Sequence, residues 1–234
     1  MKTHPVIDID GHVEMALVPD WKRHFPAPHG EALEKAILRH FSYERMKTSI
    51  RREGAWDPKA RLADMDDEGI DIAVLFGTSV GLGYDPYPPA ICQGYNSWLA
   101  HYCSANPDRL KGVALLPLAN IEAALEELHR AVSKLGFVGF LMKPSVGALT
   151  SDAECFHPLY AEAEKLNVPV MVHIAHGARA LLAKRYRLEF IREQTIGNPI
   201  SLMMALMDVI YGGVLDLFPR TRFAFLEGDV GWLP

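Results

Sequence analysis

Cysteine is scarce in this sequence of 234 residues. Its three cysteines, Cys92, Cys103 and Cys155, form no CxxC pair or other metal-ligand spacing. This excludes a cysteine-based zinc site and predicts reduced thiols, as in a cytoplasmic protein. The chain also lacks any run of 18 consecutive apolar residues, and its first residues lead directly into a predicted strand. We therefore expect neither a membrane span nor secretion.

Positive charge is not in excess either. The net charge is −5 and the isoelectric point lies near 6.1, so neither nucleic acid nor an anionic membrane is an expected partner. Glycine motifs that cradle phosphates, GxGxxG and the P-loop, are missing. Residues 77–81 match the GxSxG motif of serine hydrolases, but residues 81–89 are too rich in glycine and proline to begin the required helix. A rim loop is therefore the favoured interpretation of Ser79.

What the sequence does contain is a regular alternation of apolar, β-branched segments with amphipathic ones. Apolar residues make up 49% of the chain, enough for the core of one large domain. We predict strands at residues 6–14, 70–76, 110–116, 137–143, 169–174 and 222–227. We predict helices at residues 57–68, 88–105, 121–135, 156–166, 179–196 and 200–217, and a helical insertion at about 15–56. The alternation predicts an α/β fold with a parallel sheet, in a single domain spanning residues 1–234.

Polar side chains recur where several of these strands end, and this favours a (β/α)8 TIM barrel over a doubly wound sheet. The residues concerned are Asp10, His12, Lys143, His173 and Glu227. Barrel enzymes build their sites on the rim at the carboxyl ends of the strands. Only about six of the eight strands are recognisable, and eight at the same spacing would need roughly 300 residues, so we expect an incomplete barrel.

The opening strand carries the strongest chemical signal. Asp8, Asp10 and His12 alternate with Ile7 and Ile9, so in a strand the polar residues would share one face and the isoleucines would pack on the other. A half-exposed edge strand would show the same alternation. Two carboxylates and an imidazole before a glycine turn nevertheless favour a metal site, with Asp10 and His12 as ligands and Asp8 as support.

His173 ends another strand and would supply a third ligand for a divalent metal ion, most simply zinc and alternatively manganese. Such an ion activates water or polarises a substrate oxygen. Taken alone, a histidine at the end of a strand is as often a buried, hydrogen-bonded residue. Donors from two separate strands make the metal site the better interpretation.

Several longer motifs run through the chain in a familiar order. They are Asp8-x-Asp-x-His12, residues 61–74 (RLADMDDEGIDIAV), 95–100 (YNSWLA), 106–117 (NPDRLKGVALLP), 212–219 (GGVLDLFP) and 225–232 (FLEGDVGW). In these motifs the sequence resembles the aminocarboxymuconate-semialdehyde decarboxylase-like group of amidohydrolase-related proteins. The resemblance implies a metal-dependent barrel enzyme that decarboxylates a small aromatic or unsaturated carboxylate, and a homodimer. Hydrolysis by metal-bound hydroxide is the alternative chemistry, and a non-catalytic fragment or interaction subunit is the alternative from another class.

The resemblance also implies roles for particular residues. Asp10 stands where the family has the first histidine of a His-x-His pair, while His12 and His173 match family ligands. Glu227 stands where the family often has a histidine that acts on substrate, so Glu227 and His173 are the expected catalytic residues. The expected substrate contacts are Lys143, His176, Arg179 and Asn198. The family's ligand on strand eight has no counterpart in these 234 residues. In the wider superfamily a lysine like Lys143 can be carbamylated between two metals, but we favour a contact to a substrate carboxylate.

Overall fold

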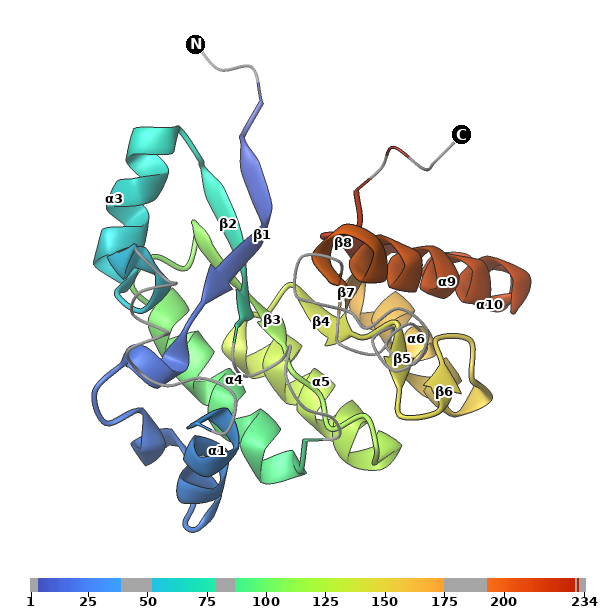
Figure 1. Ribbon diagram of the computed structural model, residues 1–234, viewed down its shortest axis with the longest axis horizontal. Helices are drawn as coiled ribbons and strands as arrows, with labels where there is room; N and C mark the ends of the chain where they lie inside the picture. Colours follow the sequence, from blue (N-terminus) through green and yellow to red (C-terminus); the bar gives the residue numbers. More distant parts are fainter. Residues whose placement is uncertain (1–3, 39–51, 79–86, 175–192, 230, 232–234) are drawn as a thin grey trace. The chain divides into compact units, whose positions relative to one another are not determined.

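The computed structural model describes residues 4–38, 52–78, 87–174, 193–229 and 231 (Figure 1). The chain divides into two compact units. The first consists of Met1–Gly81, Pro88–Leu115 and His129–Val138, and the second of Leu82–Tyr87, Leu116–Leu128 and Gly139–Pro234. Ser79, His176 and Arg179 lie outside the described residues.

The first unit is built on three parallel strands. They are β1 (Ile7–Val13), β2 (Ile72–Gly77) and β3 (Leu110–Ala114), with β2 paired to both of the others. Its helices are η1 (Met15–Leu17), η2 (Trp21–His24), α1 (His29–Leu38), η3 (Glu53–Ala55), α3 (Pro58–Glu68) and α4 (Pro89–Cys103). In Figure 1, β1 and β2 lie side by side, and α3, which directly precedes β2 in the chain, lies next to β2.

Local sequence explains where α3 begins and ends. The Asp57 side chain accepts a hydrogen bond from the backbone N–H of Lys59, and Pro58 occupies the first turn, where a missing N–H costs nothing. Gly69 ends the helix at φ 72°, a left-handed conformation that favours glycine. These are the start and stop signals on which the prediction of a helix at residues 57–68 rests.

Two polar side chains tie the helices of this unit to its strands. Asn96 is fully buried in α4, donates to the carbonyl of Leu115 and accepts from its N–H, both at 2.9 Å. Arg109 donates to the carbonyls of Ile70 and Asp71 and pairs with an aspartate of α3. Both residues belong to motifs that carry the family resemblance, and both have structural roles.

The second unit also has three parallel strands, β4 (Gly139–Met142), β7 (Val170–His173) and β8 (Phe223–Leu226), with β7 in the middle. Its helical elements are η4 (Glu154–Phe156), α6 (His157–Leu166), η5 (Glu193–Gly197), α9 (Asn198–Tyr211) and α10 (Val214–Leu217). Helix α5 (Ile121–Leu135) contributes residues to both units. A short hairpin of β5 (Ser145–Val146) and β6 (Leu149–Thr150) was not expected from the sequence.

The six parallel strands match the six segments expected to be strands, with β2 extending one residue beyond its predicted range, and this confirms the α/β prediction. The expectation for the isoleucines of β1 was wrong: Ile7 and Ile9 are each 48% exposed. Alternation reveals that a strand has two faces but not which face is covered. Gly11 is not a turn either, because the strand continues through it to Val13. Across the described ranges, no helix combines the length and apolar character needed to cross a bilayer.

Candidate metal centre

A bulge in β1 places the two expected ligands of the first unit. Asp8 pairs with Ala73, but Gly11 pairs with Leu75, so β1 contains one residue more than β2 over this stretch. Such a bulge leaves an extra residue outside the ladder and re-aims the side chains around it. The Asp8 carboxylate accepts the backbone N–H of Asp10 at 3.0 Å and thereby satisfies an amide in the bulge.

Gly11 is required at this bulge because its neighbours approach closely. A Cβ atom at this position would lie 2.9 Å from Leu75 Cδ2, 3.0 Å from the Asp8 carboxylate and 3.1 Å from the carbonyl oxygen of Val74. The backbone carbonyl cannot move out of the way without disturbing β2. A glycine between Asp10 and His12 therefore permits the bulge that aims them.

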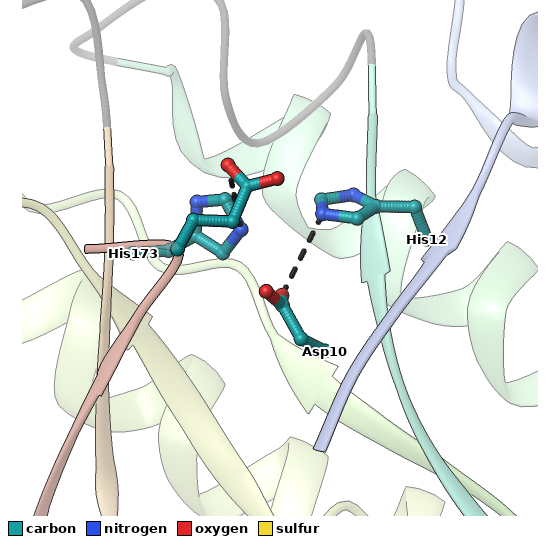
Figure 2. A group of neighbouring side chains, drawn as sticks. Asp10, His12 and His173 are labelled. Atoms are coloured by element: carbon teal, nitrogen blue, oxygen red, sulfur yellow. Dashed lines mark ion pairs between the residues drawn. The ribbon is translucent and has the colours of Figure 1, made fainter. Parts of the chain in front are cut away.

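Asp10 and His12 point toward one another (Figure 2). His12 Nε2 lies 3.6 Å from Asp10 Oδ1, and both side chains are about one quarter exposed. This separation is too long for a good hydrogen bond. It is close to the roughly 3.3 Å that separates two donors on one zinc ion with bonds of about 2.0–2.1 Å in a tetrahedral arrangement. The carbonyl of His12 also accepts a hydrogen bond from the Arg61 guanidinium, which fixes the backbone there.

The second unit supplies another pair of potential ligands, at adjacent strand ends. His173 is the last residue of β7 and pairs in register with Leu226 of β8, so Glu227 immediately follows its partner. His173 Nε2 lies 3.9 Å from Glu227 Oε2. The imidazole of His173 (Figure 2) is completely buried, whereas the Glu227 side chain is 42% exposed.

The tautomer of His173 follows from its backbone contact. Its Nδ1 lies 3.1 Å from the carbonyl oxygen of Ile174, an acceptor, so Nδ1 carries the proton. The lone pair of the neutral ring is then on Nε2, the atom nearest Glu227. Metal-binding histidines are commonly oriented in this way, by donating their other N–H to a carbonyl.

The backbone at Glu227 is unusual for a residue with a side chain. Its φ angle is 60°, in the left-handed region, and Asp229 has the same value. A Cβ at Gly228 between them would lie 2.4 Å from Leu202 Cδ1 of α9, so this segment packs tightly against the helix. Non-glycine residues adopt such conformations mainly where the surroundings enforce them, often at functional sites.

The remaining expected site residues are only partly described. Lys143 follows β4, is 5% exposed, and holds its Nζ 5.6 Å from the centre of the Tyr87 ring. Asn198 is the first residue of α9, and its carbonyl accepts from Ser201. Sequence reasoning did not find the bulge at Asp8 or the left-handed backbone at Glu227. The sequence signals for these two features were glycines, Gly11 in the bulge and Gly228 after Glu227.

A further cavity of about 400 Å³ lies in the first unit between β1, η3 and α3. Its lining includes Asp8, Arg61, Asp64 and Met65, together with His12, but not Asp10. The cavity therefore touches the supporting residue and one of the two expected ligands. Asp10 lies outside the lining of this cavity and keeps its place beside His12.

The donor set suits a divalent metal ion. Carboxylate oxygens suit manganese, magnesium and zinc, and imidazole nitrogens suit zinc and other transition metals. Asp10 with His12, and His173 with Glu227, each pair one carboxylate with one imidazole. The residues thus fit a zinc or manganese ion by their chemistry.

Comparison with known proteins agrees with this chemistry. The amidohydrolase family model matches residues 7–234. The chain is 28% identical over 176 residues to 2-amino-3-carboxymuconate-6-semialdehyde decarboxylase of Dictyostelium discoideum, covering 74% of this chain and 48% of the relative. It is 34% identical over 139 residues to gamma-resorcylate decarboxylase of Rhodococcus jostii, covering 50% of this chain and 42% of the relative. The chain thus spans about half the length of the curated relatives it matches.

A solved structure extends the likeness to the fold. It is 5-carboxyvanillate decarboxylase of Novosphingobium aromaticivorans with manganese, with a TM-score of 0.70 and 21% identity. The match covers 95% of this chain and 65% of the solved one. The prediction of a (β/α)8 barrel type, with about six of its strands in these residues, is confirmed. The chain belongs to the amidohydrolase family.

Proposed function

We propose that Asp10, His12 and His173 bind one divalent metal ion, with Glu227 beside them as the proton donor, and that the protein is a decarboxylase of a small aromatic or unsaturated carboxylate. The observation that carries the proposal is that each unit holds one carboxylate–imidazole pair at the carboxyl ends of its strands. In a (β/α)8 barrel these ends form one rim, where the active site lies. The named activities of the two relatives, both decarboxylases, support the choice of reaction.

The metal of this proposed site is zinc or manganese. The two imidazoles favour zinc, the Asp10 carboxylate also suits manganese, and the solved relative contains manganese. When bound, the ion would supply the positive charge that holds and polarises the oxygens of the substrate. Metal analysis decides between the two ions.

Glu227 has the exposure and position of a proton donor. It extends from the strand end toward solvent, whereas His173 beside it is buried. In the proposed reaction the bond between the ring carbon and the carboxylate breaks, its electron pair stays on the ring carbon, and carbon dioxide leaves. A protonated Glu227 carboxyl group transfers its proton to that carbon and regains one from solvent. Each turnover thus consumes one proton and releases one carbon dioxide.

Lys143 is proposed to bind the substrate carboxylate, since a buried ammonium group strongly favours an anion nearby. Asn198, His176 and Arg179 are proposed as further substrate contacts. The proposed assembly is a homodimer in the cytoplasm, and sedimentation velocity of the purified protein would measure its oligomeric state.

The metal site is tested by metal content. We would purify the protein and a His12→Ala/His173→Ala double variant, and measure zinc and manganese by mass spectrometry. His4→Gln, an exposed histidine, is the matched control. The proposal requires about one ion per chain in the wild type and the control, and loss of that ion in the double variant. Equal metal content in all three proteins would refute it.

The reaction is tested separately on metal-loaded protein. Carbon dioxide release from 2,6-dihydroxybenzoate, 5-carboxyvanillate and aminocarboxymuconate semialdehyde would be measured for the wild type and Glu227→Gln. Release that falls at least a hundredfold in the variant supports the decarboxylase. A bound metal with no release from any of the three compounds favours a hydrolase or a non-catalytic subunit instead.

A further inference from the structure

A second cavity in the first unit lies apart from the proposed metal ligands. It has a volume of about 140 Å³ and is formed by η2, by residues at the start of α3 and by the C-terminal half of α4. Its lining includes Arg23, His24, Trp56, Trp98, His101 and Tyr102. None of these residues belongs to the site described above.

One side of this cavity gathers three groups that are positive or can become so. The rings of His24 and His101 lie 6.1 Å apart, and Arg23 Nε–H points to His24 Nε2 at 3.5 Å. Burial lowers the pKa of His24, and the neighbouring Arg23 and His101 lower it further. In the described part of the chain, no carboxylate forms an ion pair with any of the three. Arg23 is the permanent positive charge of this group, and His24 and His101 can each add a charge when protonated.

The other side of the cavity is aromatic and rigid. Trp98 and Tyr102 are 2% and 3% exposed, and their rings lie 5.9 Å apart with a tilt of 46°. The Tyr102 hydroxyl donates to the carbonyl of Gly54, and burial raises the pKa of Tyr102 to about 12, so the ring stays neutral. Trp56, Pro19 and Pro58 complete this wall.

Size and chemistry together define the ligand. An apolar cavity of about 150 Å³ accepts one benzene ring, so 140 Å³ matches a single ring and not a larger molecule. Aromatic walls favour a flat ring, in stacked or edge-on contact. The Arg23 guanidinium favours a carboxylate, and the imidazole N–H groups of His24 and His101 can donate hydrogen bonds to it.

We propose that this cavity is a binding site for a monocyclic aromatic carboxylate, with the ring against Trp98 and Tyr102 and the carboxylate facing Arg23, His24 and His101. The site does not depend on the proposed decarboxylase or its metal, because none of its residues is shared with them.

Benzoate is the probe, applied to metal-free protein so that the proposed metal site cannot bind it through an ion. Imidazole resonances of labelled histidines are followed by NMR during titration, with His24 and His101 assigned by substitution. Bound benzoate should shift both resonances and raise the pKa of His24, whose charged neighbours are Arg23 on η2 and His101 on α4. Benzamide, which has the ring without the charge, and acetate, which has the charge without the ring, should each bind at least tenfold more weakly.

Exposed side chains provide the variants. Arg23→Gln and His101→Gln should each weaken benzoate binding about twofold to fivefold, because an exposed charge contributes about that much. His4→Gln, another exposed histidine, should leave the affinity unchanged, and circular dichroism would verify that every variant is folded. Three results would overturn the proposal: shifts confined to His12 and His173, equal affinity in the variants and the wild type, or benzamide binding as tightly as benzoate.

Discussion

Asp8 offers the sharpest test of how β1 builds its half of the metal site. The residue is not an expected ligand, yet its carboxylate holds the backbone N–H of Asp10 at 3.0 Å in the bulge. Asp8→Ala leaves that amide without this acceptor. A lost acceptor for a partly buried amide costs about 1–2 kcal/mol. We therefore expect the free energy of unfolding, measured with urea, to fall by about this amount.

Metal affinity should fall as well, because the bulge fixes where Asp10 points. Residues that orient a metal ligand by hydrogen bonding typically contribute about tenfold to a hundredfold to the affinity for the metal. Asp8→Ala should weaken manganese or zinc binding by that factor in a chelator competition assay. Asp8→Asn keeps an oxygen acceptor in the same place and should recover most of the affinity.

Two outcomes would refute this reasoning. If folded Asp8→Ala protein binds metal as tightly as the wild type, the bulge does not position Asp10. If Asp8→Asn is as weak as Asp8→Ala, the negative charge matters and the hydrogen bond does not. Ile9→Ala is the matched control on the same strand: Ile9 is half exposed, so its loss should leave metal affinity unchanged.

Three further predictions test separate features. Gly94→Ala should lower the free energy of unfolding by about 1–3 kcal/mol, because the new Cβ would lie 2.4 Å from the Phe25 ring. Helix propensity alone would raise the free energy of unfolding, because alanine favours a helix more than glycine does. Urea denaturation measures the sign of the change, and an increase in stability would contradict the steric clash. Glu227→Asn should abolish carbon dioxide release. The free energy of unfolding should stay the same or rise by up to about 1 kcal/mol, because asparagine tolerates a φ angle near 60° better than glutamate does. A clear loss of stability would contradict backbone strain at this position. His24 has a lowered pKa in the folded state, so the unfolded chain binds more protons and stability should be lost as pH falls below about 6.5. In His24→Gln, the urea concentration at the midpoint of unfolding should change less between pH 7 and pH 5 than in the wild type. The same pH dependence in both proteins would count against the lowered pKa of His24.

Much of the fold could be predicted because its signals are local. The N-cap at Asp57, the proline at the first turn and the glycine at position 69 define α3 within a few residues. Buried strands such as β2 and β7 are continuous apolar runs and were equally clear. The short β5–β6 hairpin has two-residue strands, too short for any periodicity to reveal.

The candidate site was predictable in residue type but not in geometry. Asp10, His12 and His173 could be proposed from the sequence because residues of metal-ligand type recur at the ends of two separate strands. The bulge depends on the register between β1 and β2, which no pattern within β1 encodes. The left-handed backbone at Glu227 depends on the close packing of Gly228 against Leu202, a contact between residues far apart in the chain.

The charge of the proposed site separates this chain from the family it resembles. Asp10 stands where the resemblance implies a histidine ligand, and Glu227 stands where it implies a histidine that acts on substrate, so two imidazoles are replaced by two carboxyl groups. With a divalent ion bound, the Asp10 carboxylate would offset part of its charge, and an anionic substrate would gain less net attraction at the metal. The attraction must then come from a cation of the protein, and Lys143 is a lysine with only 5% of its surface exposed. Lys143 directly follows β4, at the same ends of the strands as the proposed ligands, which is a reason to assign substrate binding to Lys143 and not only to the metal.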